Sequence, residues 1–114
     1  MNHADLLKRI RAFRDERDWA QFHNPKDMAA ALAIEASELQ EIFLWKTGSA
    51  IDATAQKKRA EIEDEVADIA VYLFEFADNQ GIDIEAVILA KLEKNAAKYP
   101  VEKAKGSSAK YTDL

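Results

Sequence analysis

Apolar residues recur at steps of three and four along most of this chain, and such steps are typical of amphipathic helices. In the first segment, Leu6, Ile10 and Phe13 share one face, and basic residues lie between them. This pattern predicts a helix that ends near Trp19. A second helix is expected over residues 25–45, because asparagine followed by proline is a typical helix start and a glycine follows the segment.

The clearest apolar repeat lies in the middle of the chain, where steps of four and three alternate through Ile62, Val66, Ile69, Leu73 and Phe76. This seam predicts a third helix that continues to residue 80. The polar residues 52–59 either form a loop or begin this helix. A fourth helix is expected from its cap, Asp83, to the residue before Pro100, because proline disfavours helix in the preceding residue. Its apolar face consists of Ile84, Val87, Ile88 and Leu92.

Few residues interrupt these helices, since the 114-residue chain has only 3 glycines and 2 prolines. We therefore predict an all-α fold whose protomer resembles a four-helix bundle. A chain of this length buries only about two-thirds of its surface on folding, so association through helix packing is expected. Residues 1–102 form the predicted helical domain. From its composition alone, the tail of residues 103–114 is expected to be flexible.

The charge and composition exclude several classes of protein. A net charge of -5 and a pI near 5.0 argue against nucleic-acid binding, which requires a clustered basic surface. Without cysteine there are no disulfides, thiolate nucleophiles or cysteine-bound zinc sites. No apolar run approaches the roughly 18 residues that span a membrane, and the N-terminal segment lacks a signal-peptide core. We expect a soluble cytoplasmic protein with no membrane partner.

Two pairs of acidic residues are the strongest candidates for chemistry. Glu35 and Glu38 are three residues apart on the second predicted helix, and Glu65 and Asp68 are three apart on the third, so each pair shares one helical face. Acidic pairs at this spacing also occur elsewhere in the chain, and a solvated helix face is the alternative interpretation. Apolar residues flank these two pairs, however, and this context places them at the border of the core.

Four carboxylates that converge at the edge of a bundle would repel one another and lose hydration, which favours a bound cation. Oxygen ligands indicate Mg²⁺ or Mn²⁺, and Mg²⁺ in proteins often takes further ligands from substrate phosphates. A structural metal site or a di-iron site would also use such carboxylates. The di-iron alternative is weakened because neither His3 nor His23 follows a glutamate by three residues.

Aromatic and basic residues are candidates to bind the rest of a phosphate-containing ligand beside the metal site. Trp19 and Trp45 lie near the ends of the first two predicted helices, where they either cover a small core or stack a nucleobase. Lys91, Asn95 and Tyr99 follow one another at four-residue steps on the fourth helix. They either form a solvated face or hold phosphate and sugar oxygens.

Several short segments in sequence order carry a family resemblance: Glu35-Ala-Ser-Glu38, Phe43-Leu-Trp-Lys46, Glu65-Val-Ala-Asp68, Lys91-Leu-Glu-Lys-Asn95 and Lys98-Tyr-Pro-Val101. With these segments the chain resembles the MazG-like nucleotide pyrophosphohydrolases, in particular the short branch that contains the dCTP pyrophosphatases. The resemblance implies Mg²⁺-dependent hydrolysis of a nucleoside triphosphate, with dCTP or a related deoxynucleotide favoured, to the monophosphate and pyrophosphate. It also implies nucleotide-pool house-cleaning by a homo-oligomer, either a dimer or a tetramer built as a dimer of dimers.

The resemblance also implies roles for individual residues. Glu35, Glu38, Glu65 and Asp68 would be the catalytic metal ligands, with Glu38 the best candidate to orient or deprotonate the attacking water. Trp19 and Trp45 would flank the base. Contacts to sugar or phosphates would come from His23, Lys46, Tyr72, Lys91, Asn95 and Tyr99. The tail, with Lys105 and Lys110, would fold over a site on a neighbouring subunit.

One position departs from the pattern of the mammalian dCTP-directed relatives. Their first helix carries a histidine near the base, and the corresponding residue here is Ile10. An isoleucine cannot read the edge of cytosine by hydrogen bonding, so the base preference stays open. A non-catalytic helical oligomerisation or regulatory module is the alternative function.

Overall fold

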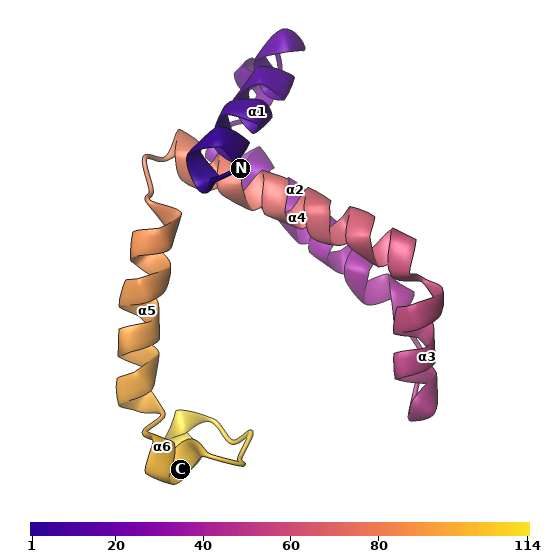
Figure 1. Cartoon of the computed structure of the whole chain (residues 1–114), viewed down its shortest axis with the longest axis vertical. Helices are drawn as coiled ribbons and strands as arrows, with labels where there is room; N and C mark the ends of the chain where they lie inside the picture. The colour runs from indigo at the N-terminus through magenta and orange to yellow at the C-terminus, as the bar shows by residue number, and fades with distance from the viewer. The chain divides into compact units, whose positions relative to one another are not determined.

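The computed structural model describes residues 1–114, and all of its regular structure is helical (Figure 1). The predicted all-α class is therefore confirmed. The chain divides into two compact units, Met1–Gly81 and Ile82–Leu114. None of the helices combines the length and apolar character that crossing a membrane requires.

The first unit is organised around one long helix. Its elements are α1 (His3–Glu16), the 3₁₀ helix η1 (Ala20–Phe22), α2 (Pro25–Ile42), α3 (Ser49–Lys57) and α4 (Arg59–Asn79). Helix α2 runs alongside α4 over most of its length, and α1 and α3 also contact α4 (Figure 1). This pairing of α2 with α4 brings the two helices that carry the acidic pairs together.

Local capping explains where several helices begin. The side chain of Asn2 accepts a hydrogen bond from the Asp5 amide at 2.9 Å, and the Asp5 carboxylate accepts one from the Asn2 amide. Asn24 caps α2 by accepting from an amide in its first turn at 2.9 Å. Asp83 likewise caps α5 (Ile84–Lys98) through the Ala86 amide at 3.0 Å. The starts predicted at asparagine-proline and at Asp83 are confirmed.

Two predicted helix ends are wrong, and both errors have a backbone cause. The first helix ends at Glu16 rather than near Trp19, because Asp18 adopts a positive φ of 54°. The second ends at Ile42 rather than at Trp45, and Trp45 itself has a φ of 64°. A residue with positive φ cannot continue a right-handed helix. Residues 52–59 lie largely in the separate helix α3, and the short helix α6 (Val101–Ala104) follows Pro100, so the chain has six α-helices where four were predicted.

The second unit consists of α5, the short helix α6 (Val101–Ala104) and the 3₁₀ helix η2 (Tyr111–Asp113). The ring of Tyr111 packs edge-on against Tyr99, with ring centroids 5.9 Å apart. The Lys98 ammonium lies 4.9 Å from the centroid of the Tyr111 ring. The tail is thus folded back on the end of α5, whereas its composition alone predicts flexibility. Its predicted place over a neighbouring subunit stays a prediction, as does the domain boundary at residue 102.

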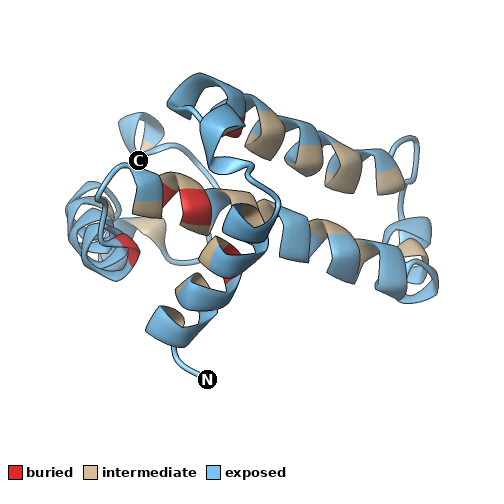
Figure 2. Ribbon diagram, turned by 90° about the horizontal axis from the view of Figure 1, so that it is seen from above, coloured by how far each residue is buried: buried red, intermediate tan, exposed pale blue.

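A single chain buries few apolar side chains completely (Figure 2). The buried apolar residues are Ile10, Met28, Ala77 and Ile84, of which Met28 is the most completely buried. In the α4 seam Val66 is 52% exposed, and on the predicted apolar face of α5 Leu92 is 57% exposed. The helical periodicity is therefore present, but much of the apolar surface it creates is not covered within the chain.

Candidate active site

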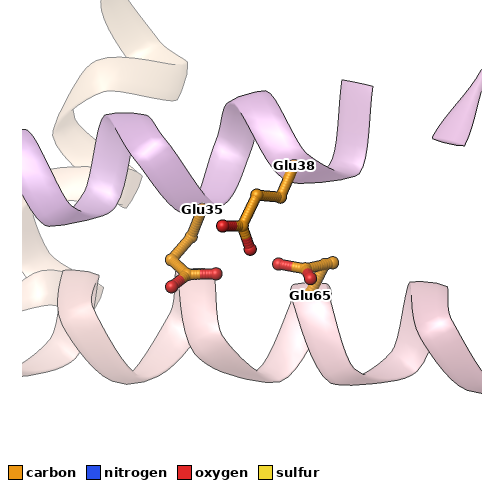
Figure 3. Close-up of side chains that lie close together, drawn as sticks. All are labelled: Glu35, Glu38 and Glu65. Carbon is orange, nitrogen blue, oxygen red and sulfur yellow. The ribbon is translucent and has the colours of Figure 1, made fainter. Parts of the chain in front are cut away.

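Three carboxylates meet between α2 and α4 (Figure 3). Glu35 and Glu38 extend from α2 toward Glu65 on α4, and one oxygen of each lies within 4.8 Å of the others. We call Glu35, Glu38 and Glu65 the acid cluster. The structure thus brings together three of the four acids singled out in the sequence. Asp68, one turn further along α4, is not among the three, although its charge acts on Glu35 and Glu65.

The acid cluster is electrostatically unfavourable when all of its members are ionised. The adjacent Glu65 carboxylate, which can share a proton with Glu35, raises the pKa of Glu35 to about 7, and burial and Glu38 add to this effect. Proton sharing with Glu35 lowers the pKa of Glu65, but burial and the charges of Glu38 and Asp68 outweigh it, so the net shift is upward. Both Glu35 Oε2 and Glu65 Oε2 are buried without a hydrogen-bond partner. A proton or a cation between these oxygens would relieve the repulsion.

The raised pKa of Glu35 predicts that the metal-free protein loses stability as the pH rises. The contribution of this group is fully present below its ordinary pKa of 4.5 and is lost as the pH rises through about 7. In EDTA, the melting temperature of Glu35→Gln should exceed that of the wild type by a few degrees at pH 7, because the amide stays neutral. At pH 4.5 the two should melt alike. If the difference in melting temperature between Glu35→Gln and the wild type were the same at pH 7 and pH 4.5, the raised pKa assigned to Glu35 would be contradicted.

On one side of the acid cluster lies a cavity of about 660 Å³, which we call the aromatic pocket. Its lining residues are Arg9, Ile10, Ala12, Phe13, Arg14, Glu16, Trp19, His23, Glu35, Asp68, Val71, Tyr72 and Glu75. The ring centroid of Trp19 lies 5.7 Å from that of Phe13 and 6.2 Å from that of His23. Burial, together with the charges of Glu35, Asp68 and Glu75, raises the pKa of Tyr72, so its hydroxyl remains a neutral donor. The pocket offers aromatic faces beside four carboxylates, those of Glu16, Glu35, Asp68 and Glu75.

A second cavity, of about 890 Å³, we call the lysine pocket. Its lining residues are Glu38, Glu41, Ile42, Leu44, Trp45, Lys46, Ala50, Ala53, Thr54, Lys57, Lys58, Glu61, Asp64 and Glu65. The acid cluster therefore contributes to both pockets, with Glu35 in one and Glu38 and Glu65 in the other. Trp19 and Trp45 do not line a common pocket within one chain, so the structure does not bring together the pair predicted to flank a base.

The remaining predicted contact residues lie in the second unit. Lys91 and Asn95 are on α5, and Tyr99 follows its last turn. Lys105 and Lys110 are exposed in the tail. Their participation in the site stays a prediction that follows from the family resemblance.

Sequence analysis did not single out Glu75, although it is among the least exposed residues of the chain, at 2% for the whole residue. Its Oε1 lies 2.8 Å from His23 Nδ1 and 3.8 Å from Arg14 Nε. A signal was present in the sequence, because Glu75 stands between Phe74 and Phe76 at the end of the apolar seam. A carboxylate at such a position requires buried partners.

Comparison with known proteins decides the family. Residues 30–114 match the model of the MazG-like family, and this segment contains the acid cluster and Asp68. The chain belongs to the MazG-like family. The resemblance recognised in the sequence is thereby confirmed.

The MazG-like chain is also similar to curated mammalian proteins. It is 39% identical to dCTP pyrophosphatase 1 of Mus musculus and 37% identical to that of Homo sapiens, over 111 residues in each case. These alignments cover 95% of the chain but only 65% of each mammalian protein. A crystal structure of a pyrophosphatase from Archaeoglobus fulgidus matches with a TM-score of 0.83 and 37% identity, over 88% of this chain and 94% of the archaeal one.

Proposed function

We propose that this MazG-like chain hydrolyses a nucleoside triphosphate to the monophosphate and pyrophosphate, with dCTP or a related or modified deoxynucleotide favoured, in nucleotide-pool house-cleaning. The observation that carries the proposal is the acid cluster, in which two buried carboxylate oxygens lack any partner beside a pocket lined with aromatic rings. The names of the mammalian and archaeal relatives support the same reaction class and, in the mammalian case, the same substrate.

The acid cluster suits a hard divalent cation. Glu35, Glu38 and Glu65 would hold it, with Asp68 as a further ligand, and an all-carboxylate donor set favours Mg²⁺, with Mn²⁺ as a substitute. The unpaired Glu35 Oε2 and Glu65 Oε2 fit this role, since a cation would satisfy both. When bound, the cation would neutralise charge on phosphate oxygens and promote ionisation of the attacking water.

We assign binding of the nucleoside to the aromatic pocket and binding of the departing pyrophosphate to the lysine pocket. In the aromatic pocket, Trp19 and Tyr72 offer ring faces and a hydroxyl to the nucleoside. In the lysine pocket, Lys46 offers a positive charge to the departing pyrophosphate. Glu38 belongs to the acid cluster and also lines the lysine pocket, which supports its assignment as the residue that would orient the attacking water or accept its proton.

Association of chains would complete the site. The exposed apolar faces on α4 and α5 need a covering surface, which we assign to other copies of the chain in a dimer or a dimer of dimers. A neighbouring copy would then supply Lys91, Asn95, Tyr99 and the tail lysines Lys105 and Lys110.

The proposed reaction predicts a simple activity profile. The purified protein with Mg²⁺ should release pyrophosphate, and not orthophosphate, from at least one nucleotide of a panel that includes dCTP, 5-modified dCTP and the ribonucleotides. EDTA should stop the release, and added Mg²⁺ should restore it, because the carboxylates alone cannot neutralise a triphosphate.

Coupled detection of pyrophosphate and of the nucleoside monophosphate measures this activity directly. A heat-denatured sample controls for contaminating phosphatase. Absence of release across the whole panel would leave the non-catalytic oligomerisation module as the function.

A further inference from the structure

The buried Glu75 carboxylate connects three elements of the first unit beside the aromatic pocket. It extends from α4, its Oε1 lies at hydrogen-bond distance, 2.8 Å, from His23 Nδ1 at the end of η1, and it lies near Arg14 of α1. The side chains of Glu75 and His23 are 3% and 17% exposed, respectively. All three residues line the aromatic pocket. Nothing in the proposed reaction so far uses Glu75 or Arg14.

The hydrogen bond to Glu75 ties an irregular segment to the long helix. Between α1 and α2 the chain turns through Asp18, and the side-chain hydrogen bonds of Gln21 go back to that residue. The bond between His23 and Glu75, in contrast, joins residues 52 positions apart. Trp19 stands in the same short segment and lies close to the His23 ring. The bond thus ties the His23 ring to α4, and the Trp19 ring lies beside the His23 ring.

The chemistry of the pair defines which ring nitrogen faces a ligand. An ionised carboxylate only accepts hydrogen bonds, and Glu75 Oε1 also lies 3.8 Å from the Arg14 guanidinium, which can only donate. His23 Nδ1 must then carry the proton that it donates. In the neutral imidazole, Nε2 is left as an acceptor. An acceptor nitrogen does not bind an anionic phosphate oxygen, but it binds a hydroxyl or an amino group.

We propose that Glu75 is a positioning residue that holds His23 in the Nδ1–H tautomer, so that Nε2 accepts a hydrogen bond from a donor group of the nucleoside in the aromatic pocket. The donor is either the sugar hydroxyl or the exocyclic amino group of the base. This inference rests on the proposed function for the identity of the ligand, and it replaces the predicted sugar or phosphate contact of His23 with a contact to the sugar or the base, not to a phosphate.

The tautomer of His23 can be measured without any turnover. The chain has only 2 histidines, so a Glu or Gln replacement at His3 leaves a single imidazole for ¹⁵N NMR. At a pH where the ring is neutral, the wild-type spectrum should show the proton on Nδ1. A proton on Nε2 would overturn the proposal, and so would a mixture of tautomers that Glu75→Met does not change.

Two substitutions separate positioning from general packing. Glu75→Met keeps the length of the side chain but removes the acceptor, and it should raise KM for the nucleoside triphosphate about tenfold with little change in kcat. Glu75→Gln keeps a carbonyl acceptor and should restore most of the affinity. Asp78→Asn is the matched control, because Asp78 pairs with Arg11 across the same two helices outside the pocket. An equal rise in KM for Glu75→Met and Asp78→Asn would contradict the inference.

Product titrations identify the donor group and keep this inference distinct from the proposed hydrolysis. Deoxycytidine monophosphate should shift the His23 Nε2 resonance. 2′,3′-Dideoxycytidine monophosphate lacks the sugar hydroxyl, so if it fails to shift Nε2 the donor is that hydroxyl. Thymidine monophosphate lacks the exocyclic amino group, so if it fails to shift Nε2 the donor is that amino group. If none of the three nucleotides shifts Nε2, the nucleoside contact is refuted. If the shift occurs in a protein that hydrolyses nothing, the contact stands and the proposed hydrolysis fails.

Discussion

Replacing Glu65 by glutamine is expected to reduce pyrophosphate release about a thousandfold, while the helical content and the oligomeric size stay unchanged. Glutamine has the shape of glutamate but carries no charge, and its amide group offers donors where a cation needs acceptors. Glu65 Oε2 is buried without a partner and lies in the acid cluster, where its loss would remove one of the proposed cation ligands. Initial rates, circular dichroism and size-exclusion chromatography together test the prediction.

The matched control for Glu65→Gln is Glu63→Gln on the same helix. Glu63 is exposed and its carboxylate pairs with Arg59 at 2.9 Å, away from both pockets. Its replacement should leave the rate unchanged, since an exposed pair of this type contributes little. In EDTA, Glu65→Gln should melt at the wild-type temperature or above it, because it relieves repulsion within the acid cluster. Full activity in Glu65→Gln would show that the reaction takes place elsewhere.

The affinity for Mg²⁺ is expected to fall about tenfold for each pH unit below about 7, since a cation competes with the proton on Glu35. Below about pH 7 the metal-free acid cluster holds a proton on Glu35, and the cation must displace this proton when it binds. Calorimetric titrations in two buffers of different ionisation enthalpy count these protons. Near pH 6 we expect about one proton released per chain, and well above pH 7 close to none.

Glu63→Gln again provides the control, because it removes one negative charge without touching the acid cluster. It should release as many protons as the wild type. An affinity that does not vary between pH 6 and 7 would mean that Glu35 is ionised throughout this range. The acid cluster would then bind cations without the proton competition described above.

Sequence alone predicted the parts of the structure that follow from local rules. The α4 helix and its apolar seam were predictable because steps of three and four residues keep apolar side chains such as Val66 and Leu73 on one helical face, even though a single chain leaves both exposed. The starts at Asn24 and Asp83 were predictable because their side chains satisfy free amides one turn later. The pairing of two acidic faces was predictable because a step of three residues keeps two side chains on one face.

The parts that sequence did not predict depend on backbone conformations or distant partners. Asp18 and Trp45 end their helices at positive φ, although neither is glycine, the residue usually associated with that conformation. Glu75 was missed because its partners, His23 and Arg14, are 52 and 61 residues away along the chain. The separation of Trp19 and Trp45 into two pockets follows from tertiary packing, which helical periodicity does not encode.

The division of the two tryptophans between the pockets gives the molecule an intrinsic optical readout. Trp45 is 89% exposed beside the lysine pocket, whereas Trp19 is 42% exposed and packs against Phe13 in the aromatic pocket. Indole emission depends on the polarity around the ring, so the two residues emit from different environments. Because the chain has no other tryptophan, a phenylalanine at either position leaves a fluorophore that reports ligand arrival on one side of the acid cluster only.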